Sequence, residues 1–263
     1  MQDLKITLLQ SDIHWQQIEA NLAMFEEKIW TIDEKTDIIV LPEMFSTGFT
    51  METEKVAEPQ NSKTYRWMAQ MAAQTGALVV GSYIIKEGKD SFNRLYCVNP
   101  EGRYYVYDKR HLFRMAEENL HFAGGSKKEI VDWKGWKILP LVCYDLRFPV
   151  WSRNRVLEGS LEYDAILYIA NWPQARVEAW DTLLRARAIE NLSYSIGLNR
   201  VGEDGNAIKY NGHSAIYDYK GDQLLFIDDK EELKTTTLSY EHLITYREKF
   251  PAHHDGDAFE IKY

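Results

Sequence analysis

Three residues with reactive side chains, Glu43, Lys109 and Cys143, each stand where an apolar segment of the chain ends. The segments before Glu43 and Cys143, residues 37–41 and 138–142, are short and almost wholly apolar, which favours strands covered on both faces. In open α/β sheets, ligand sites lie beyond the carboxyl ends of the strands. We therefore expect the three side chains to meet in one crevice, although 66 and 34 residues separate them along the chain.

The three side-chain types suit nucleophilic catalysis by a thiol. A thiol with a pKa of about 8.5 is mostly protonated at neutral pH, so it needs a base or a cation beside it. Burial makes a carboxylate a better base because it raises the pKa. A lysine ammonium favours the thiolate and can stabilise an oxyanion. The backbone N–H of Tyr144, directly after Cys143, is a natural second donor to that oxyanion.

Each residue also has a simpler explanation when it is considered alone. Free cysteine is among the most buried residue types, so Cys143 could be a small core residue, as we expect for Cys97 in the middle of a strand. Glu43 follows a proline and could be a solvated loop carboxylate. Lys109 begins the run Lys109-Arg110-His111, which could be a basic surface cluster.

Alternating strands and helices are expected to position these residues. Apolar residues at helical spacing predict helices, and short apolar runs bounded by turn residues predict strands. We expect strands at residues 5–10, 37–41, 77–85, 92–98, 103–109, 138–142, 165–170, 194–199, 207–213, 215–217, 223–227 and 232–238, and helices at 21–32, 64–75, 150–158 and 176–191. This alternation predicts a layered α/β fold. Because no linker interrupts it, residues 1–263 are expected to form one domain, with a polar tail at about 251–263.

Composition excludes several classes of protein. The 263 residues are 45% hydrophobic and 27% charged with a net charge of −9, which argues against general binding to nucleic acid or to anionic membranes. No apolar run approaches the roughly 18 residues that a membrane span requires. The chain starts without a basic segment followed by an apolar one, and it has two cysteines, so we expect a reduced, cytoplasmic protein.

Ordered motifs around the three residues resemble a known family. The motifs are Leu41-Pro42-Glu43-Met44-Phe45, Tyr107-Asp108-Lys109-Arg110-His111-Leu112-Phe113 and Val142-Cys143-Tyr144-Asp145-Leu146-Arg147-Phe148-Pro149. They resemble the three catalytic signatures of the carbon–nitrogen hydrolase (nitrilase) superfamily, in the same order. The resemblance extends to Arg185-Ala186-Arg187-Ala188-Ile189-Glu190-Asn191 and Gly212-His213-Ser214-Ala215-Ile216.

The resemblance implies a fold and a set of roles. The implied fold is a four-layer αββα sandwich, usually dimerising through one helical face, and we expect a homodimer or a higher homo-oligomer. Because it is polar, the tail at about 251–263 is expected to be mobile, extended or packed on a partner subunit. The implied roles are nucleophile for Cys143, general base for Glu43 and stabiliser of the tetrahedral intermediate for Lys109. Many members have a second glutamate after the lysine, and Glu118 matches that position, although the adjacent Glu117 is an alternative.

Substrate-binding residues are expected beyond the strand at residues 165–170. Asn171 and Trp172 follow that strand and are expected to rim the crevice, with Trp172 either an aromatic wall or a core residue. Arg176 and Arg147 are candidates to bind a substrate carboxylate, because a guanidinium pairs with carboxylates in a bidentate manner. For Arg147 we favour a structural ion pair. Arg185 and Arg187 are expected in intramolecular pairs or at an interface.

Within the superfamily, the sequence is most similar to the omega-amidase branch. This similarity rests on His111-Leu112-Phe113-Arg114-Met115, Asn171-Trp172-Pro173 and the run from Arg185 to Asn191. It implies a cofactor-independent amidohydrolase that cleaves omega-amides of 2-oxo dicarboxylates, such as 2-oxoglutaramate. A nitrilase or an N-carbamoyl amide hydrolase with the same residues is an alternative, and a non-catalytic binding protein on the same fold is another.

Other motifs give weaker signals. His253-His254-Asp255 is a tract in the tail and is a poor candidate for a metal site. Gly124-Gly125-Ser126-Lys127 lacks the full pattern of a phosphate-binding loop. No histidine stands out as a partner for Cys143 of the kind that papain-like enzymes use.

Overall fold

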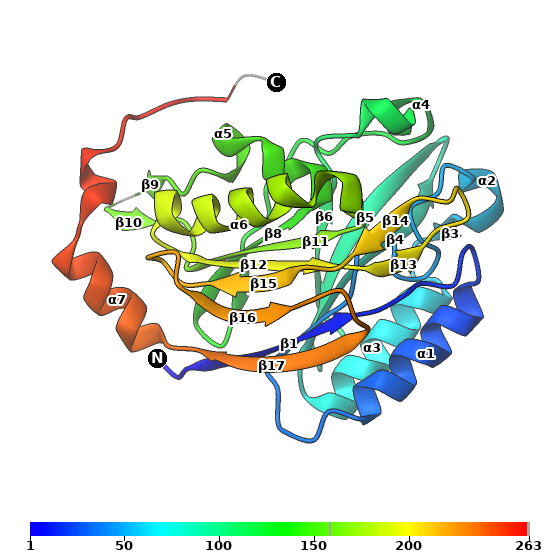
Figure 1. Ribbon diagram of the computed structural model, residues 1–263, viewed down its shortest axis with the longest axis horizontal. Coiled ribbons are helices and arrows are strands. Elements are labelled where there is room, and N and C mark those ends of the chain that lie inside the picture. The colour runs from blue at the N-terminus through cyan, green and yellow to red at the C-terminus, as the bar shows by residue number, and fades with distance from the viewer. Residues whose placement is uncertain (158, 262–263) are drawn as a thin grey trace.

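Two large β-sheets form the centre of the computed structural model, which describes residues 1–157 and 159–261 (Figure 1). The seven-stranded sheet has the order β17 (Glu232–Leu238), β1 (Leu4–Gln10), β2 (Ile38–Val40), β4 (Leu78–Glu87), β5 (Asp90–Val98) and β6 (Tyr104–Asp108), with β3 (Glu58–Pro59) paired to β4. The six-stranded sheet has the order β16 (Gln223–Ile227), β15 (Ser214–Tyr217), β12 (Tyr194–Asn199), β11 (Ala165–Ala170), β8 (Trp136–Val142) and β7 (Val131–Trp133).

Side chains alternate between two cores along the seven-stranded sheet. Ile38 and Val40 of β2 point into the core between the two sheets, whereas Ile39 packs under the helices on the outer face. These helices are α1 (Ile18–Trp30) and α3 (Lys63–Thr75). The strand period of two therefore explains why β2 is apolar at every position.

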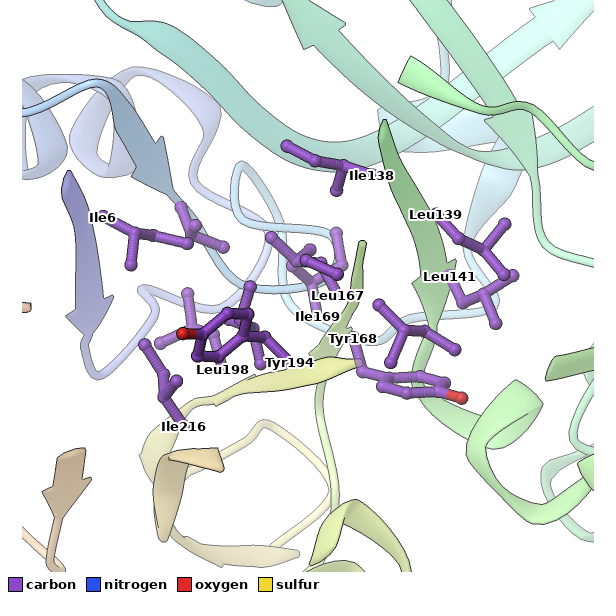
Figure 2. Packing of buried hydrophobic residues seen from close by; sticks show 14 of the residues in the cluster. Ile6, Ile138, Leu139, Leu141, Leu167, Tyr168, Ile169, Tyr194, Leu198 and Ile216 are labelled. Atoms are coloured by element: carbon purple, nitrogen blue, oxygen red, sulfur yellow. The ribbon is translucent and has the colours of Figure 1, made fainter. Parts of the chain in front are cut away.

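The six-stranded sheet is covered in the same way. Helix α6 (Val177–Asn191) places Trp180 and Leu184 on the sheet, and Gly197 of β12 makes room for them, since a Cβ there would collide with Leu184. Figure 2 shows part of the core that the sheets share, with Ile6 from one sheet and Leu198 from the other. The layers are thus helix, sheet, sheet, helix, which confirms the predicted αββα sandwich (Figure 1).

Parallel strands bring several carboxyl ends to one side of each sheet. In the seven-stranded sheet, β2 runs parallel to β4. Since β5 is antiparallel to β4 and β6 is antiparallel to β5, β6 runs in the same direction as β2. In the other sheet β8, β11 and β12 are parallel.

The helix predicted at residues 150–158 is shorter in the structure than expected. Helix α5 (Pro149–Ser152) has four residues, and β9 (Val156–Leu157) follows it and pairs with β10 (Ser160–Leu161). Residue 158 lies outside the described residues. Asn154 stops the helix, because its backbone N–H donates to Asn191 and its side chain donates to the carbonyl of Tyr163 at 2.8 Å.

Helix α7 (Tyr240–Lys249) was not predicted, because few of its residues are apolar. A buried ion pair attaches it to the second sheet: Nη1 of Arg247 lies 2.8 Å from Oδ1 of Asp164. Arg247 also donates to the backbone carbonyls of Tyr163 and Leu192. The helix is thus fixed by tertiary hydrogen bonds that no local pattern reveals.

The tail begins with a short 3₁₀ helix, η4 (Ala252–Asp255), and residues 256–261 form neither helix nor strand. Ile261 packs against the main hydrophobic core, and residues 262 and 263 lie outside the described part of the chain. Packing of the tail on a partner subunit stays a prediction. Among the described helices, none has the length and apolar character needed to cross a membrane.

Candidate active site

Glu43, Lys109 and Cys143 come together at the carboxyl ends of three strands. Glu43 follows β2 and Lys109 follows β6 in the seven-stranded sheet, whereas Cys143 follows β8 in the six-stranded sheet. The three residues are 0%, 1% and 8% exposed. The site is therefore assembled between two sheets, and its geometry depends on how those sheets are placed relative to each other.

The ammonium of Lys109 lies between two carboxylates. Its Nζ is 3.0 Å from Oε1 of Glu43 and 2.9 Å from each carboxylate oxygen of Glu118. The ring of Phe49 covers the same nitrogen, with its centroid 5.0 Å away, in a cation–π contact. Because an unpaired buried ammonium is very unfavourable, the two carboxylates are what keep Lys109 charged in this position.

Both oxygens of Glu43 are held by hydrogen bonds. The side-chain amide of Asn93 donates to Oε1 at 2.8 Å, and the backbone N–H of Asn171 donates to Oε2 at 2.8 Å. The side chain of Asn171 also donates to the backbone carbonyl of Glu43 at 2.6 Å. Asn171 thus lines the site as predicted, but its amide orients Glu43.

Glu118, rather than Glu117, is the second glutamate of the site. Glu118 begins the short helix α4 (Glu118–His121), is fully buried and accepts the backbone N–H of Phe113 at 2.6 Å. Glu117 is exposed and has left-handed backbone angles, with φ of 57°. That local turn directs the two neighbouring carboxylates to opposite environments.

Cys143 stands at a sharp turn from strand to helix. Its φ is 44°, in the left-handed region that non-glycine residues rarely adopt, and it opens the 3₁₀ helix η2 (Cys143–Arg147). Its Sγ lies 3.8 Å from the carbonyl oxygen of Asn171. The N–H of Tyr144 belongs to the first turn of η2, where intrahelical bonding leaves N–H groups free, so it suits the expected oxyanion contact.

Charges inside the site shift the pKa values of its members. Burial raises the pKa of the Cys143 thiol well above its ordinary range, and the nearby Glu43 raises it further, while Lys109 opposes them. For Lys109, burial lowers the pKa, but Glu118 and Glu43 together outweigh it, so the net pKa is raised. Burial also raises the pKa of Glu118, against the effect of Lys109. The raised pKa of Cys143 therefore favours the protonated thiol over the thiolate at rest.

A cavity of about 720 Å³ opens over Cys143 and Lys109. That volume is typical of small-molecule sites. Tyr144 and Trp172 form part of its wall, and the side chain of Trp172 is only 3% exposed. Trp172 thus belongs to the core and presents one face to the cavity, so both of the predicted roles apply to it.

Two arginines line the cavity and have no carboxylate partner among the residues that the structure describes. Arg147 lies over the ring of Trp172, at 4.9 Å from its centroid, and Arg176 lies over the ring of Phe113, at 5.3 Å. Neither takes part in any ion pair among the described residues. The structural ion pair expected for Arg147 is therefore wrong: its guanidinium is available to a ligand in the cavity.

Other predicted residues lie away from the reaction centre. Arg187 pairs with Glu190 at 2.8 Å, as expected, while Arg185 takes part in no ion pair of the described residues. Cys97 is buried in the core between the sheets, which confirms its prediction. The described part of the tail contributes to no cluster of three potential metal ligands, nor does the rest of the described chain.

Sequence reasoning missed two buried polar residues beside the site, Asn93 and Asp145. Asn93 lies within β5 and holds Glu43, and Asp145 lies two residues after Cys143 and is fully buried. A polar side chain inside a buried strand needs a hydrogen-bond partner, so the run Phe92-Asn93-Arg94-Leu95 carried a usable signal for Asn93. Two of the residues that donate to Asp145, Tyr107 and His111, belong to the other sheet and the segment after it, and no local pattern indicates them.

Comparison with known families decides the classification. Residues 5–248 match the carbon-nitrogen hydrolase family. The chain belongs to that family. This carbon-nitrogen hydrolase is 47% identical to the omega-amidase YafV of Escherichia coli over 262 residues, which cover 99% of this chain and 100% of that protein.

Two further similarities refine this placement. The 2-oxoglutaramate amidase of Bacillus subtilis is 30% identical over 253 residues, covering 95% of this chain and 96% of that protein. A crystal structure of a CN-hydrolase superfamily protein from Xanthomonas campestris, with an arsenic adduct in its active site, superposes with a TM-score of 0.98 at 43% identity and covers all of both chains. The omega-amidase branch of the superfamily predicted from the motifs is thereby confirmed.

Replacing the charged neighbours of Cys143 is expected to shift its pKa in opposite directions. Glu43→Gln removes a negative charge that raises the thiol pKa, so the pKa falls; Lys109→Met removes the cation that lowers it, so the pKa rises. In Glu43→Gln, thiolate therefore forms at lower pH than in the wild type. Titration of the ultraviolet absorbance of the thiolate measures this, with Cys143→Ala subtracted to remove Cys97. Shifts in the reverse order would contradict the charge arrangement described above.

Proposed function

We propose that this protein is a cysteine-dependent amidohydrolase that cleaves a small linear amide into an acid and ammonia through a thioester, without a cofactor. One observation carries the proposal: a buried lysine between two glutamates lies beside a buried thiol at the base of a cavity. This arrangement contains a nucleophile, a base within hydrogen-bond reach and a cation for the oxyanion.

In the first step, Sγ of Cys143 attacks the amide carbon and its proton passes to Glu43. The carbon–sulfur bond forms while the carbonyl oxygen becomes an oxyanion, which Lys109 and the N–H of Tyr144 stabilise. The raised pKa of the resting thiol fits this sequence, because a proton that moves to Glu43 adds no net negative charge to a buried site. Removing one oxyanion donor typically costs about 10²- to 10³-fold in turnover.

In the second step, the oxyanion collapses and the carbon–nitrogen bond breaks. Glu43 returns its proton to the departing nitrogen, which leaves as ammonia. Water then attacks the thioester as Glu43 takes one of its protons, the carbon–sulfur bond breaks, and the acid departs as the thiol regains a proton. Glu118 keeps Lys109 in place throughout and helps to position the amide.

The proposed substrate is an omega-amide of a 2-oxo dicarboxylate, such as 2-oxoglutaramate. Such a molecule carries a carboxylate at the end opposite the amide. Arg147 and Arg176 offer two cations in the same cavity as Cys143, and both lie over aromatic rings. The names of the E. coli and B. subtilis relatives support the same substrate class.

We also propose that residues 1–263 form a single carbon-nitrogen hydrolase domain. Two further proposals are that two copies form a homodimer and that the protein resides in the cytoplasm. A reactive thiol suits a reducing compartment. The dimer proposal is supported by exposed apolar side chains on neighbouring elements of the α5 and α6 side (Figure 1), namely Val150, Leu157 and Ile189.

Ammonia release from 2-oxoglutaramate is expected with the wild-type protein and not with Cys143→Ala, because the alanine cannot form the thioester. Glutamine, a simple nitrile and an N-carbamoyl amino acid serve as comparison substrates. Turnover of only the nitrile or the carbamoyl compound would show that the protein is a nitrilase or an N-carbamoyl amide hydrolase and not an omega-amidase. Turnover by Cys143→Ala equal to the wild type would eliminate the mechanism. No turnover of any compound, together with no trapped thioester by mass spectrometry, would favour a binding protein.

Arg147→Met and Arg176→Met are each expected to raise the KM for 2-oxoglutaramate by about 10- to 100-fold. The estimate follows from about 1.5–3 kcal/mol for a hydrogen bond to a charged group. The KM for a neutral straight-chain amide should not change, because it has no carboxylate to lose. Arg114→Met, at an exposed arginine outside the cavity lining, is the matched control. If the substitutions raised the KM equally for charged and neutral amides, the two arginines would have a structural role and not a substrate-binding one.

Light scattering is expected to give twice the mass of one chain. Val150→Glu combined with Ile189→Glu should yield the monomer, because two charges would then face each other across an apolar contact. Trp30→Glu is the control, since Trp30 is similarly exposed but lies on α1, on the opposite helical layer (Figure 1). A wild-type protein with the mass of one chain would refute the proposed dimer.

A further inference from the structure

The reacting groups come from different sheets, so something must fix one sheet relative to the other at the site. Lys109 follows β6 of the seven-stranded sheet, and Cys143 follows β8 of the six-stranded sheet. Apolar contacts between the sheets are not directional, whereas hydrogen bonds are. A displacement of about 1 Å at a reaction centre can lower the rate by about 100-fold.

The carboxylate of Asp145 bridges the two sheets at the segments that carry Lys109 and Cys143. Asp145 is fully buried, and each of its two carboxylate oxygens has two hydrogen-bond partners. Oδ2 accepts the hydroxyl of Tyr107 at 2.8 Å and the backbone N–H of Val142 at 3.1 Å. Oδ1 accepts the backbone N–H of His111 at 3.0 Å and lies 2.7 Å from its ring Nδ1.

The donors to Asp145 lie next to the reacting residues along the chain. Tyr107 is two residues before Lys109 and His111 is two residues after it, so Asp145 contacts the lysine segment on both sides. Val142 directly precedes Cys143. One carboxylate therefore ties the backbone that carries the lysine to the backbone that carries the thiol.

The turn at Cys143 needs such a restraint. A non-glycine residue in the left-handed region costs on the order of 1–3 kcal/mol and persists only where its surroundings impose it. The hydrogen bond from Val142 to Asp145 closes this turn, and Arg187 of α6 donates to the carbonyl of Leu146 at 2.6 Å on its other side. Phe148 stacks on the ring of His111 at 3.8 Å, which adds a further contact between the two segments.

We propose that Asp145 is a positioning residue that fixes the placement of Cys143 relative to Lys109. It does not face the cavity, since it is not among the residues that line it, so it acts through Val142, Tyr107 and His111. The effect on turnover rests on the proposed function, whereas the effect on the two side chains does not.

The test replaces Asp145 by asparagine, which keeps the shape but loses one acceptor oxygen. For 2-oxoglutaramate, kcat is expected to fall by about 100-fold while KM stays unchanged, because the cavity and its arginines are not altered. Asp164→Asn is the matched control: Asp164 is also a buried carboxylate with a charged partner, but it anchors α7 away from the site. It should lower the unfolding temperature and leave kcat unchanged.

A second readout needs no substrate. Lys109→Met is expected to raise the pKa of Cys143 in the wild-type background, and this shift should become smaller in the Asp145→Asn background if Asp145 sets the separation between the two side chains. An equal shift in both backgrounds, or an unchanged kcat in Asp145→Asn, would overturn the proposal. Absence of turnover by the wild type would instead refute the proposed function, while the thiol titrations would still decide the role of Asp145.

If Asp145→Asn fails to fold, Tyr107→Phe provides the same test with a milder change. It removes one donor to Asp145 and leaves the carboxylate and its bond to Val142 in place. We expect a smaller fall in kcat with unchanged KM, and a reduced effect of Lys109→Met on the thiol. Wild-type kcat in Tyr107→Phe together with the full effect of Lys109→Met would overturn the proposal.

Discussion

The buried charge of Lys109 is the constraint on which the site depends. An ammonium removed from water is stable only if carboxylates surround it, and Glu43 and Glu118 meet this need. Two carboxylates around one cation leave an excess of negative charge, which disfavours a resting thiolate. Burial and the two carboxylates that keep the lysine charged thus both favour the neutral form of the thiol.

This charge balance is spread over two sheets, and buried hydrogen bonds connect them. Asn171, after β11, donates to Glu43, after β2, and Asp145 joins the segments around Lys109 and Cys143. Hydrophobic packing supplies most of the attraction between the sheets, but the attraction itself is not directional. Directional polar contacts at one end of the sandwich can therefore define a reaction centre that apolar packing alone would leave loose.

The sequence was informative where local pattern and chemistry coincide. Strand-end positions identified Glu43, Lys109 and Cys143, and the family resemblance identified Glu118 and the layered fold. The status of Arg147 could not be predicted, because whether an arginine has a carboxylate partner depends on residues distant in the chain. The same holds for the donors to Asp145 from the other sheet and for α7, whose anchor at Asp164 is visible only after folding. Tertiary contacts decide all three.

The left-handed backbone at Cys143 has a consequence for how the protein can change over time. At that angle glycine has a lower conformational energy than any other residue. The position that carries the proposed nucleophile is therefore one where backbone stability alone would favour a residue without a reactive group. Stability therefore favours glycine at this position, whereas the proposed reaction requires cysteine. A lineage released from selection for the proposed reaction could therefore gain stability by replacing the proposed nucleophile with glycine, without a change to the rest of the sandwich.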